Sequence, residues 1–250
     1  MIALNNFTFS YQQHPALHHI SGRFERGSLT AVIGPNGSGK STLLKSLAGL
    51  LPQQHKRHAR SLQWTAPHPR LAYLPQRSEL DRAFPITVQD CVLLGAWGRM
   101  GGFSGAFSGV DSGTLAQVTH ALHTVGLQGL ERRTLGTLSS GQLQRVLFAR
   151  LLVQDADLIL LDEPFNGVDS KTTTSLLAVI AKWHQQQRTV IAVLHDDAQV
   201  RQHFPNTLLL AREMVAWGPT HEVLTEAHLA RSRAMAQAWD EDAALCERAP

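Results

Sequence analysis

Continuous apolar runs mark the buried strands expected in this chain. Residues 28–33, 157–161 and 189–194 are apolar on both faces, which is typical of strands covered on both sides in a parallel sheet. Residues 2–11 alternate apolar and polar positions, and this pattern predicts a half-buried strand at the edge of a sheet.

Segments with helical spacing of apolar residues separate these runs. They are residues 40–50, 86–94, 114–125, 140–152 and 170–185. One more strand is expected at residues 71–74, which end at Pro75. Strands that alternate with helices predict an α/β fold with a mainly parallel sheet. Residues 98–113 contain too many glycines for a regular element and predict a loop.

The order of these elements predicts a single domain over residues 1–250 with one insertion. The expected division is a core of residues 1–76 and 153–225, an α-helical subdomain of residues 77–152, and a C-terminal tail of residues 226–250. The acidic residues 240–242 of the tail are expected to be loosely held.

The composition excludes several classes of protein. The chain has 250 residues, of which 43% are hydrophobic and 17% charged, the balance of a folded protein. No apolar run approaches the roughly 20 residues of a membrane span, and no secretory signal is recognisable, so a cytoplasmic location is expected. The net charge is only +3 and the basic cluster at residues 55–60 is short, so no nucleic acid partner is expected. Cys91 and Cys246 are far apart and predict ordinary reduced thiols.

A glycine-rich loop between a predicted strand and a predicted helix is the strongest chemical signal. Residues 34–41 read Gly-Pro-Asn-Gly-Ser-Gly-Lys-Ser and match the phosphate-binding pattern G-x-x-x-x-G-K-[S/T]. Backbone N–H groups of such a loop surround a polyphosphate, and the helix N-terminus adds a positive partial charge. Lys40 is expected to reach the β and γ phosphates, and Ser41 to bind Mg²⁺.

Three polar residues follow buried strands, where ligands bind in a parallel sheet. Asp162 ends the run at 157–161 and is the expected magnesium partner. Glu163 comes directly after it and is the candidate general base for an attacking water. His195 follows the run at 189–194 and is expected to donate a hydrogen bond to a phosphoryl oxygen.

These motifs together resemble the ATP-binding cassette (ABC) ATPases that drive transporters. The resemblance covers about residues 1–225 and includes further short motifs in the family's order. Tyr11 is similar to the aromatic residue that stacks on adenine, and Gln76 to the Q-loop glutamine. Residues 138–142, Leu-Ser-Ser-Gly-Gln, resemble the LSGGQ signature. Residues 166–169 resemble the D-loop, and His195 the switch histidine.

The resemblance implies a P-loop NTPase core with a mainly parallel sheet, an N-terminal antiparallel β region and an inserted α-helical subdomain. It also implies a Mg²⁺-dependent ATP hydrolase in which two subunits enclose two ATP molecules head to tail. The implied catalytic residues are Glu163, His195 and Gln76, and the implied metal ligands are Ser41, Gln76 and Asp162. The implied ATP-binding residues are Tyr11, Gly34, Pro35, Asn36, Gly37, Ser38, Gly39, Lys40, Ser41, Thr42, Ser139, Gly141 and Gln142.

The chain departs from the family pattern at two places. Ser140 stands where the first signature glycine is expected, whereas Gly141 keeps the second. A hydroxymethyl group at position 140 is expected to be tolerated, because Gly141 still allows the backbone to approach a phosphate. Residues 53–65 lack the usual glycine-containing turn.

Short matches point to a subgroup of the family. Residues 94–102 and 163–169, with the pair Phe84-Pro85, are most similar to the ATPases of zinc and manganese importers, and next to those of iron-chelate importers. The partners implied are a second ATPase subunit, transmembrane permease subunits and, indirectly, an extracytoplasmic substrate-binding protein. The implied location is peripheral, at the cytoplasmic face of the inner membrane. The apolar candidates for permease contact are Phe84, Trp97, Met100 and Phe103.

Two other functions stay open at this point. One is a soluble ABC ATPase without a membrane partner, although the chain has a single glycine loop and no sustained heptads. The other is a module that senses ATP without hydrolysing it, which the presence of Glu163 and His195 argues against.

Thirteen histidines raise the alternative of direct binding of a transported metal. The close sets are His18 with His19, His55 with His58, and His120 with His123. None has a carboxylate or cysteine nearby in sequence to complete a coordination shell, so we expect solvated histidines and Mg²⁺ as the only bound metal.

Overall fold

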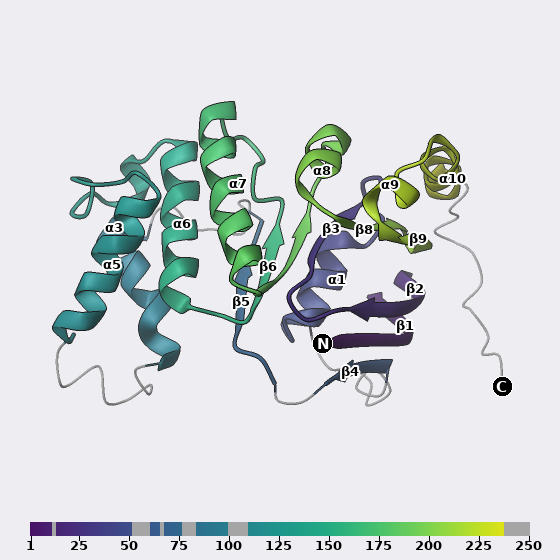
Figure 1. The fold of residues 1–250 in the computed structure, drawn as a ribbon, viewed down its shortest axis with the longest axis horizontal. Helices are drawn as coiled ribbons and strands as arrows, with labels where there is room; N and C mark the ends of the chain where they lie inside the picture. Colours follow the sequence, from purple (N-terminus) through teal and green to yellow (C-terminus); the bar gives the residue numbers. More distant parts are fainter. Residues whose placement is uncertain (12–13, 52–60, 66–67, 77–83, 100–109, 238–250) are drawn as a thin grey trace. The chain divides into compact units, whose positions relative to one another are not determined.

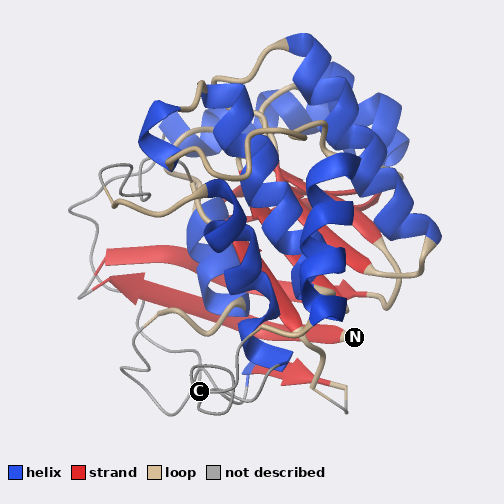
Figure 2. Cartoon of the chain, turned by 90° about the vertical axis from the view of Figure 1, so that its left-hand side faces the viewer, coloured by secondary structure: helices blue, strands red, loops and turns tan. Residues whose placement is uncertain are grey.

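The computed structural model describes residues 1–11, 14–51, 61–65, 68–76, 84–99 and 110–237. The chain forms two compact units. The first contains residues 1–68 and 191–250, and the second contains residues 69–190. Both combine strands with helices, which confirms the predicted α/β class (Figure 2).

A three-stranded antiparallel sheet in the first unit confirms the predicted N-terminal β region. Its order is β2 (His14–Phe24), β1 (Ile2–Tyr11) and β4 (Leu62–Trp64) (Figure 1). The prediction that residues 2–11 form an edge strand is wrong, because Ile2, Ala3 and Leu4 pair with β2 on one side and with β4 on the other. Alternating polarity shows that one face of a strand is buried, but it carries no information about neighbours within the sheet.

The first unit also contains parallel strands. The strand β3 (Leu29–Ile33) pairs in parallel with β8 (Asn206–Ala211), and β9 (Glu213–Pro219) pairs antiparallel with β8. β7 (Thr189–Val193) is buried along its whole length, and the Leu194 N–H that follows it donates to the Val32 carbonyl at 3.1 Å. These pairings confirm a mainly parallel sheet with buried apolar strands.

The helix after the glycine loop is shorter than predicted. α1 spans Lys40–Leu47 rather than residues 40–50. Gly49 adopts a φ of 68°, a left-handed conformation that ends helices, and the Leu50 N–H closes the end by donating to the Lys45 carbonyl at 3.0 Å.

Three helices complete the first unit. They are α8 (Asp197–His203), α9 (Thr220–Val223) and α10 (Glu226–Gln237). α10 packs against β8 and β9, so the first half of the predicted tail is a helix. The acidic residues 240–242 lie outside the described residues.

The second unit places helices beside a parallel strand pair, β5 (Leu71–Leu74) and β6 (Leu158–Asp162). Its helices are α3 (Val88–Leu93), the 3₁₀ helix η2 (Leu94–Arg99), α5 (Ser112–Thr124), the 3₁₀ helix η3 (Leu135–Thr137), α6 (Ser140–Gln154) and α7 (Ser170–Gln185). α6 packs against α3, α5 and α7 (Figure 1). The limits of α7 are those predicted. The proposed subdomain of residues 77–152 remains a prediction.

Capping residues account for two differences at helix starts. α3 begins at Val88 instead of residue 86, because the Thr87 hydroxyl accepts the Asp90 N–H at 3.2 Å. α5 begins at Ser112, two residues earlier than predicted, because Asp111 accepts the Thr114 N–H at 2.9 Å. The loop predicted at residues 98–113 is therefore too long at both ends, since η2 continues to Arg99 and α5 begins at Ser112. Residues 100–109 lie outside the described residues. Within the described residues, no helix is long and apolar enough to cross a membrane.

Candidate functional site

The glycine-rich loop joins the end of β3 to the start of α1, as predicted. Its positive φ angles, 75° at Gly37 and 89° at Gly39, belong to a conformation that glycine adopts readily. Lys40 is buried, and its Nζ donates to the carbonyl oxygens of Gly34 at 2.9 Å and Pro35 at 2.8 Å. The ammonium group thus lies against the first two residues of the loop.

Two glycines of the loop are in close contact with neighbouring backbone. A Cβ at Gly34 would lie 2.0 Å from the Leu210 carbonyl oxygen, and one at Gly39 would lie 2.3 Å from the Ala16 carbonyl oxygen. Both distances are far below van der Waals contact, so any larger residue would displace β8 or β2. The loop is therefore shaped by the strands on either side of it.

The loop is chemically suited to a polyphosphate. Asn36 and Gly37 are exposed, Ser41 and Thr42 are half-buried, and Ser38 is 2% exposed. The Ser38 hydroxyl has no hydrogen-bond partner within the described residues. An anion held by the loop's N–H groups and by Lys40 would supply an acceptor in this region.

Two other predicted residues of the first unit lie near strand ends. Tyr11 is the last residue of β1, is 47% exposed, and packs edge-on against Phe9 with ring centroids 5.1 Å apart. Its ring therefore has free surface for stacking. His195 is exposed and stands two residues after β7, directly before Asp196, which caps α8 by accepting the Ala198 N–H at 2.9 Å.

The second unit brings the predicted carboxylates and the Q-loop glutamine together. Asp162 is the last residue of β6 and is 1% exposed, and the Tyr73 hydroxyl donates to its Oδ2 at 3.4 Å. Glu163 follows with a φ of 50°. Its Oε2 accepts from Gln76 Nε2 at 2.9 Å and from Asn166 Nδ2 at 3.1 Å. Two amide groups thus orient the candidate base, whose φ is unusual for a non-glycine residue.

The residues that resemble the signature open α6. Ser139 and Gln142 form a capping box: the Ser139 Oγ accepts the Gln142 N–H at 3.2 Å, and Gln142 Oε1 accepts the Ser139 N–H at 2.9 Å. Ser140, the departure from the family pattern, is half-buried at the first helical position. The capping box uses the N–H groups of Ser139 and Gln142 and fixes the start of α6.

Gly141 is closely packed within the same unit. A Cβ there would lie 3.1 Å from Asp169 Oδ2 and 3.3 Å from Thr172 Oγ1. Asp169 caps α7, accepting the Thr172 N–H and hydroxyl, each at 2.9 Å. These hydrogen bonds lower the pKa of Asp169 below its ordinary value, with the positive charge of Arg145 acting in the same direction. The signature and the D-loop therefore meet through Gly141.

The predicted magnesium ligands supply suitable atoms. Ser41 offers a hydroxyl, Asp162 a carboxylate at a strand end, and Gln76 its Oε1, since its amide nitrogen is used by Glu163. Oxygen ligands of these types are those that Mg²⁺ takes in nucleotide sites. The donor set fits the ion.

The histidines do not form a metal centre within the described part of the chain, where no group of three or more metal-binding side chains occurs. His18 Nδ1 lies 3.2 Å from Glu213 Oε1. His120 and His123 are exposed on α5, whereas His55 and His58 lie outside the described residues.

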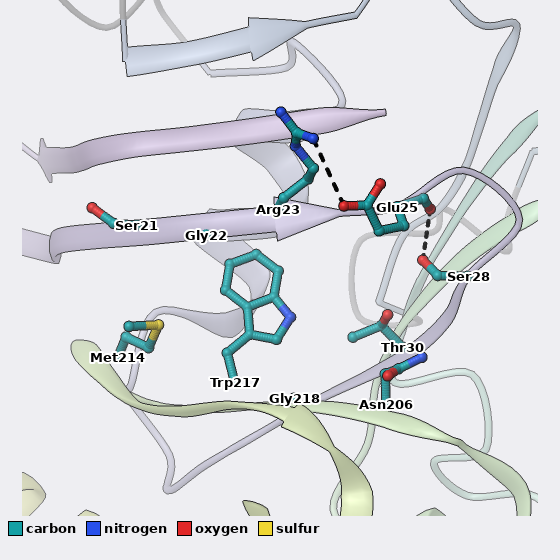
Figure 3. A pocket seen from close by; sticks show the side chains of 10 residues that line it. All are labelled: Ser21, Gly22, Arg23, Glu25, Ser28, Thr30, Asn206, Met214, Trp217 and Gly218. Carbon is teal, nitrogen blue, oxygen red and sulfur yellow. Dashed lines mark hydrogen bonds and ion pairs between the residues drawn. The ribbon is translucent and has the colours of Figure 1, made fainter.

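A cavity of about 350 Å³ lies in the first unit at a different place from the phosphate loop (Figure 3). Its lining includes Thr30 and Asn206, at the starts of β3 and β8, whereas the phosphate loop follows the end of β3. The indole of Trp217 lies against Gly22, where a Cβ would be 2.4 Å from the ring. The cavity is thus separate from the candidate nucleotide site.

Sequence reasoning missed three contacts of the site residues. Asn166 was assigned only to the D-loop, although its position three residues after Glu163 is compatible with a turn that brings the two together. No pattern indicates that Tyr73 donates to Asp162. Arg212, whose N–H donates to the Ser38 carbonyl at 3.0 Å, carries no motif.

Comparison with known proteins gives consistent matches over nearly the whole chain. The profile of the family described as ABC transporter matches residues 17–166. The manganese transport system ATP-binding protein MntB of Listeria monocytogenes is 38% identical over 224 residues, covering 89% of this chain and 92% of the relative. The zinc transport system ATP-binding protein TroB of Treponema pallidum is 37% identical over 232 residues, covering 92% and 86%.

A solved structure supports the same relationship. It is an ABC transporter of metal-chelate type in an inward-facing conformation, with a TM-score of 0.77 and 28% identity, covering 93% of this chain and 88% of that one.

Proposed function

Since the chain belongs to the ABC transporter family and is the ATP-hydrolysing subunit of such a transporter, we propose that it powers the import of a divalent metal ion, manganese or zinc. The identity of 37–38% to two metal transport ATP-binding proteins, over about nine tenths of the chain, carries this proposal.

The phosphate loop accounts for ATP binding. In this proposal the N–H groups of residues 34–42 and the ammonium group of Lys40 hold the phosphates, and Tyr11 stacks on the adenine. The contacts of Lys40 Nζ with the Gly34 and Pro35 carbonyl oxygens place its charge beside the loop, which supports this role.

The carboxylates account for hydrolysis. Glu163 accepts the proton of the attacking water, and the amides of Gln76 and Asn166 keep its Oε2 in place. His195 donates a hydrogen bond to the transferred phosphoryl group. Ser41, Gln76 and Asp162 would hold Mg²⁺, which neutralises charge on the phosphates when bound.

A second copy of the chain completes the catalytic unit in this proposal. The N-terminus of α6, with Ser139, Gly141 and Gln142, faces the nucleotide of the partner subunit, where the N–H groups of a capped helix attract a phosphate. ATP therefore holds the closed dimer together, and hydrolysis releases it.

The membrane partners are transmembrane permease subunits, which this chain contacts at the cytoplasmic face of the inner membrane and which receive the metal from an extracytoplasmic substrate-binding protein. Phe84 and Trp97 of the second unit are 61% and 55% exposed, which supports their role as apolar contacts for a permease. The other two candidates, Met100 and Phe103, lie outside the described residues.

Metal content tests the transported substrate. Cells that lack the native gene receive the wild type, Glu163→Gln or the exposed control Glu222→Gln, and grow with limiting metal. We expect wild type and control to restore cellular manganese or zinc, and Glu163→Gln to fail. If both metals are unchanged in all strains while the purified wild type hydrolyses ATP, the metal-ion assignment is wrong.

The same cultures test the second candidate, import of a metal chelate, which the metal-chelate type structure at 28% identity favours. A deficit of iron alone in the Glu163→Gln strain, measured with a chelated iron source, would replace the first proposal by this one.

A further inference from the structure

The turn between β8 and β9 contacts both the phosphate loop and β2. The Arg212 N–H donates to the Ser38 carbonyl at 3.0 Å, and the Arg212 carbonyl accepts the His18 N–H at 2.9 Å. The next residue, Glu213, places its Oε1 3.2 Å from His18 Nδ1. The backbone of one residue thus connects the loop that holds phosphates with a strand of the N-terminal sheet.

Arg212 adopts an unfavourable backbone conformation to make these contacts. Its φ is 62°, in the left-handed region that glycine occupies readily and other residues seldom do. Strained non-glycine residues persist where the surrounding structure requires them, and they gather at functional sites. The conformation of Arg212 therefore marks a position that its surroundings hold in place.

The side chain of Arg212 makes a third connection. Its Nη1 donates to the Pro15 carbonyl at 3.3 Å. Pro15 pairs with Ser10 and the neighbouring His14 pairs with Tyr11, so Pro15 lies at the end of the β1–β2 hairpin that carries Tyr11. The next residue along β2, Ala16, contacts Gly39 of the phosphate loop.

We propose that Arg212 is a positioning residue for the nucleotide. Its guanidinium group and backbone fix the hairpin end that carries Tyr11 relative to the phosphate loop, so that the adenine and the phosphates of one ATP are held at once. This inference rests on the proposed roles of Tyr11 and the loop. Loss of the guanidinium group weakens the binding of ligands that span both elements, and leaves unchanged the binding of ligands that touch the loop alone.

The variant Arg212→Gly separates this role from general stability. Glycine keeps both backbone hydrogen bonds, relieves the left-handed conformation and removes the side-chain contact with Pro15. In equilibrium binding to the full-length chain, we expect the Kd for ATP to rise about three- to tenfold, the range expected when one hydrogen bond of ordinary strength is lost. The Kd for inorganic tripolyphosphate stays constant, and Tm does not fall. Arg212→Lys recovers part of the ATP affinity.

A matched control is Arg201→Ala. Arg201 belongs to the same unit and its guanidinium also donates to a backbone carbonyl, that of Leu224, away from the loop and the hairpin. This variant is expected to lower Tm without changing the Kd for ATP. An unchanged ATP affinity in Arg212→Gly, or an equal loss of affinity for ATP and tripolyphosphate, overturns the positioning role.

The variant Tyr11→Ala distinguishes this inference from the function on which it rests. Weaker binding of ATP, with unchanged binding of tripolyphosphate, establishes the adenine contact at Tyr11. If Tyr11→Ala binds ATP as tightly as the wild type does, the proposed adenine contact and the positioning role of Arg212 are both wrong. A wild-type chain that binds neither ligand contradicts the nucleotide-binding function itself.

Discussion

Two glycines of the phosphate loop provide a matched pair of substitutions. Gly37 and Gly39 both have positive φ, 75° and 89°, so alanine at either position is strained. They differ in their surroundings. A Cβ at Gly37 has nothing within 4 Å, whereas a Cβ at Gly39 would lie 2.3 Å from the Ala16 carbonyl oxygen and 2.6 Å from Leu17 Cδ2.

The expected losses of stability follow from these surroundings. The left-handed conformation costs an alanine about 1–2 kcal/mol, so Gly37→Ala is expected to lower the free energy of unfolding by that amount. In Gly39→Ala the Ala16 carbonyl must also move by about 1 Å, and overpacking of this kind costs a further 1–3 kcal/mol or so. With roughly 2–4 °C of Tm per kcal/mol at this chain length, Gly39→Ala should melt several degrees below Gly37→Ala.

Thermal unfolding followed by circular dichroism measures both variants under one set of conditions. The variants share loop, residue type and sign of φ, so the difference between their Tm values reports the contact with β2. Equal Tm values would refute the conclusion that β2 shapes the loop. A Tm for Gly37→Ala below that of Gly39→Ala would contradict the described surroundings of both glycines, open at Gly37 and crowded at Gly39.

Four further outcomes are expected. Glu163→Gln should lower the rate of phosphate release by about 10²–10⁴-fold while retaining ATP binding. The same variant should elute as an ATP-dependent dimer in gel filtration. A rate of phosphate release equal to that of Glu222→Gln would contradict the role of Glu163 as the base. Asp169→Ala should be less stable than wild type at neutral pH. Because the pKa of Asp169 is lowered in the folded state, this difference in stability should disappear as the pH falls below the ordinary pKa of 3.8 and through the folded-state pKa. A difference in stability that persists at lower pH in acid denaturation curves would exclude a carboxylate cap. Gly141→Val should lower Tm more than Ser140→Val, because only position 141 faces Asp169 and Thr172. Burial raises the pKa of the Cys91 thiol. In the variant Cys246→Ser, Cys91 should therefore react with a thiol reagent far more slowly in the folded protein than in denaturant. Equal reaction rates would place Cys91 at the surface.

The hydrophobic pattern predicted β1, β3, β5, β6 and β7 and the helices α1, α5, α6 and α7, because burial on both sides or on one face produces a recognisable spacing of apolar residues. It did not predict β2, β4, β8 and β9. The limits of α7 agree with the prediction because the capping residue Asp169 and the basic residues Lys182 and His184 of the last turn are also local signals. The place of β1 between β2 and β4 was not predictable, since pairing depends on which strands meet in three dimensions. The early end of α1 depends on the φ of Gly49, which the apolar spacing does not show.

The chemistry of the site was predictable where function requires a residue type at a fixed spacing. The phosphate loop and the pair Asp162 and Glu163 are of this kind. The residues that support them are not: Tyr73 and Arg212 reach their partners from distant segments, and any hydrogen-bond donor of suitable length would serve. The amide contact of Gln76 with Glu163 falls between these cases, because the motif named the residue but not its partner.

The packing around Gly141 explains why this chain tolerates a serine in its signature at position 140 and keeps glycine at 141. Ser140 is half-buried at the start of α6, where serine is compatible with a helix N-terminus. Gly141 instead lies against Asp169, whose carboxylate caps α7. The turn that precedes this cap begins at Glu163 and includes Asn166, which holds the candidate base. A side chain at position 141 would therefore press on the segment that orients Glu163, so residues of its own subunit constrain the signature, in addition to the partner's nucleotide in the proposed dimer.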